Sequence, residues 1–249
     1  VEASTVAPLG SGAYEPPAPL DPQYVLWNQP LSDVNRNYYA NQDFDTADDN
    51  YDIFVADDFT NADPWAVDTI FVPSGTYNEG CDLDCAEALT WQIYGDAGGK
   101  PDGDPWGSGN APLWSLSLPP SDPRVSLSTG GGDWASDVTL SLDTPLHVPA
   151  GTWWLVAFPS LDMGACGCQS ARHVADTTFG YAAQVINAGG AFGIPTTWTS
   201  VQDPSTWELT QQDFAFRLEG SMAGPVEVIA QAKADIGDGD VFAIGDADL

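Results

Sequence analysis

The chain has 249 residues and carries 36 acidic against six basic side chains, so its formal charge at pH 7 is −30 with histidine neutral. This balance excludes nucleic acid as a partner and polybasic adhesion to a membrane, because both require a basic surface. The sequence contains no run of 18 or more apolar residues, so no membrane-spanning helix is predicted. With 43% hydrophobic and 17% charged residues, the composition is typical of a packed globular protein.

The start of the chain bears on its location. Val1 is not followed by a basic segment and an apolar one, so we expect the mature form of an exported protein, extracellular or at a cell surface. The low lysine and high aspartate content also suits a protein in strong brine, where an acidic surface keeps it hydrated. An ordinary exported acidic protein with bound calcium is the alternative, and composition alone does not separate the two.

Four cysteines form two tight pairs, Cys81 with Cys85 and Cys166 with Cys168, that lie far apart in the sequence. In an exported chain we expect two disulfides. A bridge within the second pair would close a small strained ring, so the first pair is expected to cross-link with the second. The exact connectivity stays open, and a zinc site with four cysteine ligands is the alternative.

Three segments are predicted along the chain, an arm at each end and a folded body between them. Residues 1–23 are proline-rich without a period and are expected to form an extended arm. In residues 24–220, short apolar runs recur between Gly, Pro, Asp and Asn clusters, which predicts an all-β, antiparallel, jelly-roll-like sandwich. Residues 221–249 are predicted to hold a linker, a terminal strand and an Asp-rich loop.

Nine segments of the body have the length and pattern of strands, and nine or ten strands are therefore expected. In chain order they are residues 25–27, 53–59, 67–72, 89–94, 113–118, 137–142, 151–158, 182–186 and 213–219. Trp153 and Trp154 are neighbours in one of them, so the period of two sends them to opposite faces of the sheet.

Beyond residue 225 the sequence alternates cleanly, which predicts a strand outside the body. Such a strand has an unpaired backbone and an apolar stripe that need a sheet edge. Donation to a neighbouring subunit builds a filament when the head-to-tail contact does not close, and folding back onto its own body is the alternative. Which terminus donates stays open, because the proline-rich arm at residues 1–23 is the other candidate donor. The apolar stripe consists of Val226, Val228, Ala230, Ala232 and Ala234.

Seven motifs are similar to those of exported bacterial cell-surface modules, the kind found beside sorting or anchoring tails. They are VLWNQ (25–29), NQDF (41–44), ADDFT (56–60), WAVDTIFV (65–72), YGDAGGKP (94–101), GTWWL (151–155) and FAFRLEG (214–220). The resemblance implies a β-sandwich over residues 24–220 and assigns no activity. The end of this chain departs from the pattern, because it carries the alternating segment instead of an apolar span with a basic flank.

Aspartates crowd together in three places and are candidate ligands for calcium, which prefers carboxylate oxygens. Solvated acidic loops are the alternative. The third group has glycines between its ligands but lacks the glutamate of an EF-hand, so no EF-hand is predicted. The candidate ligands are Asp43, Asp45, Asp48 and Asp49, then Asp102 and Asp104, then Asp235, Asp238 and Asp240.

Catalytic motifs are missing from the sequence. Its two histidines, His147 and His173, belong to no His-Glu-x-x-His pattern, and there is no Gly-x-Ser-x-Gly elbow or phosphate-binding glycine loop. We therefore predict a protein without enzymatic activity. A carboxylate pair for glycoside hydrolysis keeps a calcium-dependent hydrolase as the third hypothesis.

Ten tryptophans point to carbohydrate binding, because sugar rings stack on exposed indole faces. Four of them lie in loop-like sequence and are the candidate glycan contacts, Trp106, Trp134, Trp198 and Trp207. A carbohydrate-binding or adhesion module is the second hypothesis. The leading one is a non-enzymatic extracellular structural subunit that self-associates into a filament or layer by donating its terminal strand.

Overall fold

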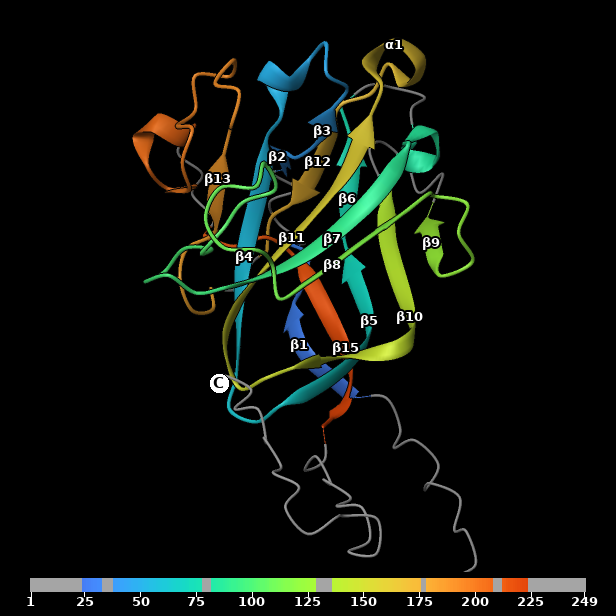
Figure 1. Cartoon of the computed structure of the whole chain (residues 1–249), viewed down its shortest axis with the longest axis vertical. Coiled ribbons are helices and arrows are strands. Elements are labelled where there is room, and N and C mark those ends of the chain that lie inside the picture. The colour runs from blue at the N-terminus through green and yellow to red at the C-terminus, as the bar shows by residue number, and fades with distance from the viewer. Residues whose placement is uncertain are drawn as a thin grey trace, which may run out of the picture.

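The computed structural model describes residues 24–32, 38–77, 82–128, 136–175, 178–207 and 212–223 (Figure 1). These residues form an all-β fold of mostly antiparallel sheets, as the sequence predicts, with one short α-helix among them. The N-terminal arm and the alternating terminal segment with its Asp-rich loop lie outside the described residues.

One face of the sandwich is an antiparallel five-stranded sheet. Its order is β1 (Tyr24–Gln29), β15 (Phe216–Met222), β5 (Trp65–Val72), β10 (Asp137–Val148) and β9 (Val125–Ser128). β15 runs past the predicted end of the body, because Ser221 and Met222 still pair with Ala66 and Trp65. The strand therefore extends two residues beyond the predicted boundary at residue 220.

The opposite face is a larger sheet in the order β14 (Thr199–Ser200), β13 (Gln184–Ile186), β4 (Phe54–Asn61), β11 (Gly151–Leu161), β7 (Ala88–Gly95) and β8 (Trp114–Leu118). The two-residue strand β3 (Asp43–Phe44) adds to it in parallel to β11. A small third sheet consists of β2 (Tyr38–Ala40), β12 (Ser170–His173) and β6 (Ser74–Thr76). The helical turns are η1 (Asp49–Tyr51), η2 (Leu83–Cys85), α1 (Met163–Cys166) and η3 (Pro204–Thr206).

The main core lies between the five-stranded and the seven-stranded sheet. Alternate side chains of the strands supply it, including Ile70, Trp91, Val138 and Leu155, all of which are buried. This is the arrangement expected when one face of each strand is apolar and the two sheets stack face to face.

The seven-stranded sheet is also buried on its outer face. Trp153 packs against the main core, whereas Trp154 is fully buried on the other side with Phe54 and Tyr94, so the predicted opposite orientation is confirmed. Loops cover this outer face in place of helices, and the Trp154 Nε1 atom donates a hydrogen bond to Asp96 in one of them (2.9 Å).

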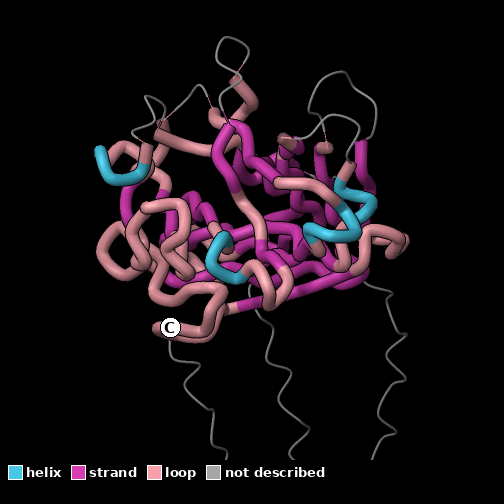
Figure 2. Tube along the Cα trace, turned by 90° about the horizontal axis from the view of Figure 1, so that it is seen from above, coloured by secondary structure: helices cyan, strands magenta, loops and turns pink. Residues whose placement is uncertain are grey.

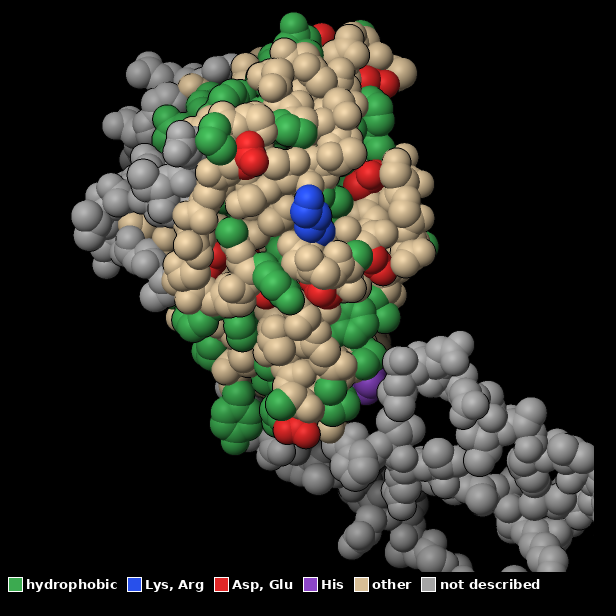
Figure 3. Space-filling model, turned by 90° about the vertical axis from the view of Figure 1, so that its left-hand side faces the viewer, with side chains coloured by type: hydrophobic (Ala, Val, Ile, Leu, Met, Phe, Trp, Pro, Cys, Tyr) green, Lys and Arg blue, Asp and Glu red, His purple; other side chains and the backbone are tan. Residues whose placement is uncertain are grey.

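Figure 3 shows the side of the molecule where one basic side chain lies among scattered acidic ones.

Fifteen strands occur among the described residues, more than the nine or ten expected. All nine predicted segments contain a strand. The additional ones are β2, β3, β6, β9, β12 and β14, which have two to four residues each. Such short strands offer too few side chains to reveal a period, and they form because longer elements bring partners to them.

Leu155 on the central strand β11 tests this account of the core. We expect Leu155→Ala to lower the free energy of unfolding by roughly 2–5 kcal/mol, because it leaves a cavity between the two sheets. Leu113→Ala, which changes an exposed side chain, serves as the control and should have little effect. Denaturant unfolding measures both values, and a similar loss in the two variants would contradict the assignment.

Candidate functional site

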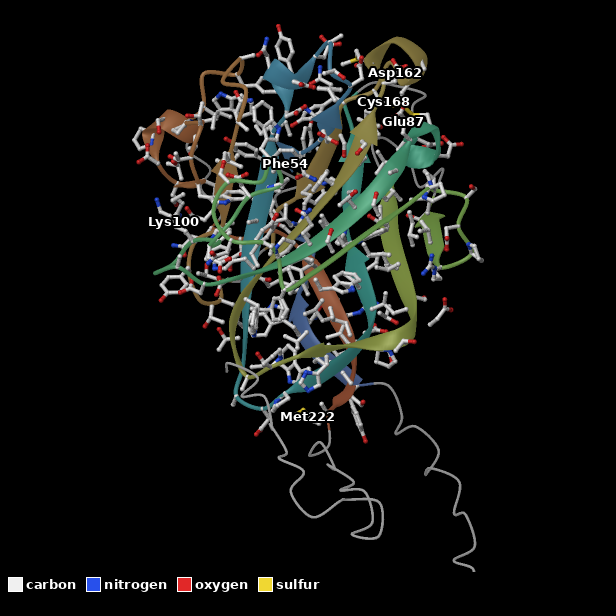
Figure 4. All side chains as sticks on the ribbon, viewed as in Figure 1. Phe54, Glu87, Lys100, Asp162, Cys168 and Met222 are labelled. Carbon is white, nitrogen blue, oxygen red and sulfur yellow. A yellow bond between two sulfur atoms is a disulfide. The ribbon has the colours of Figure 1, made fainter. Side chains whose placement is uncertain are left out.

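The two ends of the sandwich differ in what they carry. At one end, the arm end, β1 begins and β15 finishes, because Tyr24 pairs with Gly220 and Met222 lies close beyond (Figure 4). At the opposite end, the loop end, the turns η1 and η3 and the helix α1 connect the strands (Figures 1 and 2). The loop end is the candidate site, because binding residues concentrate on loops held by a rigid scaffold.

Three aromatic side chains meet at the loop end, and we call them the aromatic platform. Trp207 follows η3 and is 51% exposed, and Tyr51 in η1 is 45% exposed. Phe192 lies between them, with its ring centroid 5.7 Å from that of Trp207 and 5.5 Å from that of Tyr51. Both ring pairs are edge-to-face, the arrangement that aromatic quadrupoles favour.

Trp207 is held in place at a conformational cost. Its φ of 67° is the only positive φ among the described residues other than glycine. Strain of this kind costs about 1–3 kcal/mol and persists only where the surroundings impose it. The indole stacks on the buried Tyr39 ring at 5.1 Å, and the Tyr39 hydroxyl donates a hydrogen bond to the Thr206 carbonyl. The indole is therefore fixed while half of its surface remains exposed.

A buried asparagine joins the two loops that carry the other platform rings. Asn187 donates its Nδ2 atom to the carbonyls of Asn50 (3.2 Å) and Asp52 (2.6 Å) and accepts a hydrogen bond from the Phe192 amide (2.8 Å). Gly189 permits this approach, since a Cβ atom there would lie 2.3 Å from the Asn50 Cα atom. The hydrogen bonds of the Asn187 side chain and the close backbone approach at Gly189 thus set the position of η1 relative to the 187–194 loop.

A hollow of about 180 Å³ opens beside the platform. Its polar groups include the Asp48 carboxylate and the Gln169 amide, and neither side chain makes a hydrogen bond or ion pair with any residue that the structure describes. An apolar concavity with a few unpaired polar groups is the usual character of a small-molecule site. The hollow is lined by Phe44, Asp48, Tyr51, Met163, Gln169 and Phe192.

The four tryptophans predicted to contact glycan differ in their location and exposure. Trp207 belongs to the platform. Trp106 is 47% exposed but is not among the residues that line the hollow, and its Nε1 atom donates to Asp52 (2.9 Å). The expected surface position of Trp198 is wrong, because its side chain is only 7% exposed and helps to cover the outer face of the sheet. Trp134 lies outside the described residues.

The predicted calcium ligands do not come together among the described residues. No three carboxylates there place an oxygen each within 4.8 Å of one another. Ser160 donates to Asp43, Asn110 to Asp102 and the Ser108 amide to Asp104. Asp45 is exposed, Asp49 begins η1 and Asp48 lines the hollow, whereas Asp235, Asp238 and Asp240 lie outside the described residues. Calcium binding stays a prediction.

A disulfide between Cys85 and Cys166 joins η2 to α1, pairing one cysteine of each predicted pair as expected. Cys168 is also disulfide-bonded, and Cys81 lies outside the described residues. The three described sulfur atoms lie within 4.8 Å of one another, but a disulfide leaves no thiolate for a metal, which favours disulfides over zinc. Figure 4 shows Cys168 and Asp162 at the loop end.

Sequence reasoning missed a network of three buried carboxylates near the middle of the molecule. Asp57 and Asp58 are adjacent in β4, and Asp213 precedes β15. These side chains accept hydrogen bonds from backbone amides, Phe214 to Asp57, Tyr181 to Asp58 (3.0 Å) and Phe179 to Asp213 (2.6 Å). The only available signal was two adjacent aspartates inside a predicted strand, where charge is rare.

One cation and one amide complete this network. Arg172 in β12 is fully buried and attracts the Asp57 carboxylate, and Gln29 in β1 donates its Nε2 atom to Asp57 (3.3 Å). The network therefore joins strands of all three sheets to the loop that contains Phe179 and Tyr181. The carboxylates thus accept hydrogen bonds from backbone amides of that loop.

Burial dominates the electrostatics of the network. The pKa of Asp58 is raised to about 7, mainly by burial and in addition by the nearby Asp213 and Asp96 carboxylates. Burial also raises the pKa of Asp213 to about 6, against the hydrogen bond from the Phe179 amide. For Asp57 the pKa is likewise raised by burial and by Asp213. Asp58 and Asp213 both repel the Asp57 carboxylate, and Arg172 attracts only Asp57 among the three, so protonation relieves part of the repulsion.

No family model, curated protein or solved structure matches the chain. The resemblance to exported bacterial cell-surface modules therefore stays a prediction. None of the helices in the described ranges has the length and apolar character needed to cross a membrane.

The raised pKa values predict how stability depends on pH. Between about pH 4 and pH 7 the unfolded chain releases protons that folded Asp58 and Asp213 retain, so the free energy of unfolding should fall as the pH rises through this window. Thermal unfolding at a series of pH values measures the slope. Asp58→Asn should flatten it, whereas Asp143→Asn, at a largely exposed side chain, should not. Stability that rises over the same window would refute the assignment.

Proposed function

We propose that the chain is a non-enzymatic carbohydrate-binding module whose ligand rests on the aromatic platform at the loop end. The observation that carries this proposal is the exposed indole of Trp207. The backbone of this residue has a strained positive φ, and the Tyr39 ring stacks against the buried side of the indole. Folding alone gains nothing from exposing a large aromatic ring in this way, whereas a sugar ring gains a flat apolar surface to stack on.

The surroundings of Trp207 support the same function. Tyr51 and Phe192 extend the apolar surface, and their loops are held by the buried Asn187. Rigid aromatic groups bind with a small loss of side-chain entropy, so a platform fixed before binding favours affinity. Asp48 and Gln169 at its margin offer oxygen and nitrogen atoms for sugar hydroxyl groups.

The disulfide between Cys85 and Cys166 supports an extracellular or cell-surface location for such a module, because disulfides persist in oxidising compartments. In that setting glycan binding would amount to adhesion.

A second function, assembly by strand donation, is favoured by the arm end. β1 is an edge of the five-stranded sheet and pairs only with β15, so one side of its backbone is open among the described residues. Tyr24 and Val25 at its start are exposed apolar residues. The segment that contains Val226–Ala234 by sequence follows β15, the neighbour of this open edge. A neighbouring subunit with an open β1 is the acceptor that we propose for that segment.

Trp207→Ala tests the carbohydrate-binding function. We expect this variant to lose glycan affinity by roughly tenfold or more, the usual effect of removing an aromatic anchor. A glycan array followed by calorimetric titration of the strongest ligand measures the change. Trp106→Ala, which removes an equally exposed indole outside the platform, is the matched control and should bind normally. Equal loss in both variants, or no glycan bound by the full chain, would contradict the proposal.

Deleting residues 224–249 tests assembly. Negative-stain electron microscopy of the full chain should show regular filaments, and the deletion should leave dispersed particles because the donated segment is removed. Deleting residues 1–23 is the control and should leave filaments intact. Filaments that survive the first deletion, or a full chain that never polymerises, would rule out donation of the C-terminal segment.

A further inference from the structure

The hollow beside the aromatic platform contains polar groups, including a carboxylate, that stacking of a sugar ring on an aromatic face does not require. We propose that it binds the protonated amino group of an amino sugar, with Asp48 as the counter-ion. This inference rests on the proposed carbohydrate-binding function and names the class of sugar that the site takes. It follows from three properties of the hollow, which are its aromatic walls, a carboxylate that has no partner among the described residues, and the absence of basic groups among its lining residues.

The walls of the hollow are rich in aromatic rings. Phe44, Tyr51 and Phe192 line it, and Met163 adds a polarizable thioether. Aromatic faces attract ammonium groups through their quadrupole, and the attraction grows as the site loses water. Phe44 is buried, so its ring forms the floor, whereas the half-exposed Tyr51 forms part of the rim.

Asp48 supplies the negative charge. It stands at the N-cap position of η1, yet its side chain makes no capping hydrogen bond, and the described part of the chain gives its carboxylate no other partner. The adjacent Asp49 begins the same turn, and no lysine or arginine is among the residues that line the hollow. An unpaired carboxylate beside aromatic rings favours a cation over a neutral group.

The other groups of the site fit the rest of the sugar. The Gln169 side-chain amide also lines the hollow without a described partner and offers both a donor and an acceptor to a ring hydroxyl. Trp207 lies one ring further along the platform, next to Phe192, where a neighbouring sugar of an oligomer would stack. The net charge of −30 disfavours glycans that carry uronate or sulfate groups.

Calorimetric titration with three hexasaccharides at about pH 6 tests this inference. The probes are hexamers of glucosamine, of N-acetylglucosamine and of glucose, which have β-1,4-linked backbones and differ in charge and substitution. We expect the glucosamine hexamer to bind at least tenfold more tightly than the other two. Asp48→Asn should remove this preference and leave the affinity for the neutral hexamers unchanged.

Two controls separate the site from general attraction of cations to an acidic protein. Asp63→Asn makes the same change of charge in the exposed turn between β4 and β5, away from the hollow, and should keep the preference. A lysine hexapeptide should bind more weakly than the glucosamine hexamer. Thermal unfolding verifies that Asp48→Asn is folded, and Asp48→Ser provides a second variant at the position.

The outcomes distinguish this inference from the function on which it rests. Equal affinity for the three hexamers, with binding lost in Trp207→Ala, would overturn the amino-sugar assignment and leave carbohydrate binding intact. A preference reduced equally by Asp48→Asn and Asp63→Asn would assign it to diffuse charge and also overturn the inference. If none of the hexamers binds, both proposals fail for these glycans.

Discussion

The fold depends on a central sheet that is apolar on both faces. Leu155 and Val156 are neighbours in β11 and both are fully buried, one in the main core and the other beneath the covering loops. A sheet of this kind has to be covered twice. The five-stranded sheet covers one face, and long loops cover the other. The loop that contributes Trp198 to this cover also carries Phe192, so the candidate site is built from segments that the sheet requires.

The acidic composition serves the interior as well as the surface. The loop containing Phe179 and Tyr181 has no strand partner for two of its amides, and buried carboxylates accept their hydrogen bonds instead. Each buried aspartate costs desolvation, which appears as a raised pKa, and each gains a charge-assisted bond to the backbone. Arg172 limits the repulsion at Asp57. Few basic residues are present in the chain, and Arg172 lies where a buried carboxylate requires a positive charge.

Local patterns predicted the longer strands and the opposite orientations of Trp153 and Trp154, because a period of two is visible within a few residues. Compartment and ring strain predicted the cross-paired disulfide. The platform was beyond such reasoning, since Tyr51, Phe192 and Trp207 come from segments far apart in the sequence and meet only in the folded structure. Trp198 was misplaced because a loop rich in small and polar residues suggests exposure, and nothing local records that the loop covers an apolar sheet.

The arrangement of β1 and β15 has a consequence for mechanical load. The two strands are neighbours and antiparallel, and the start of one lies beside the end of the other. Tension applied between residue 24 and residue 222 would break their hydrogen bonds one after another, so resistance would be low. Tension between the arm end and a ligand held at the loop end would run along the strands and load many hydrogen bonds at once. A module anchored by its arms and pulled by its ligand is thus loaded in its stronger direction.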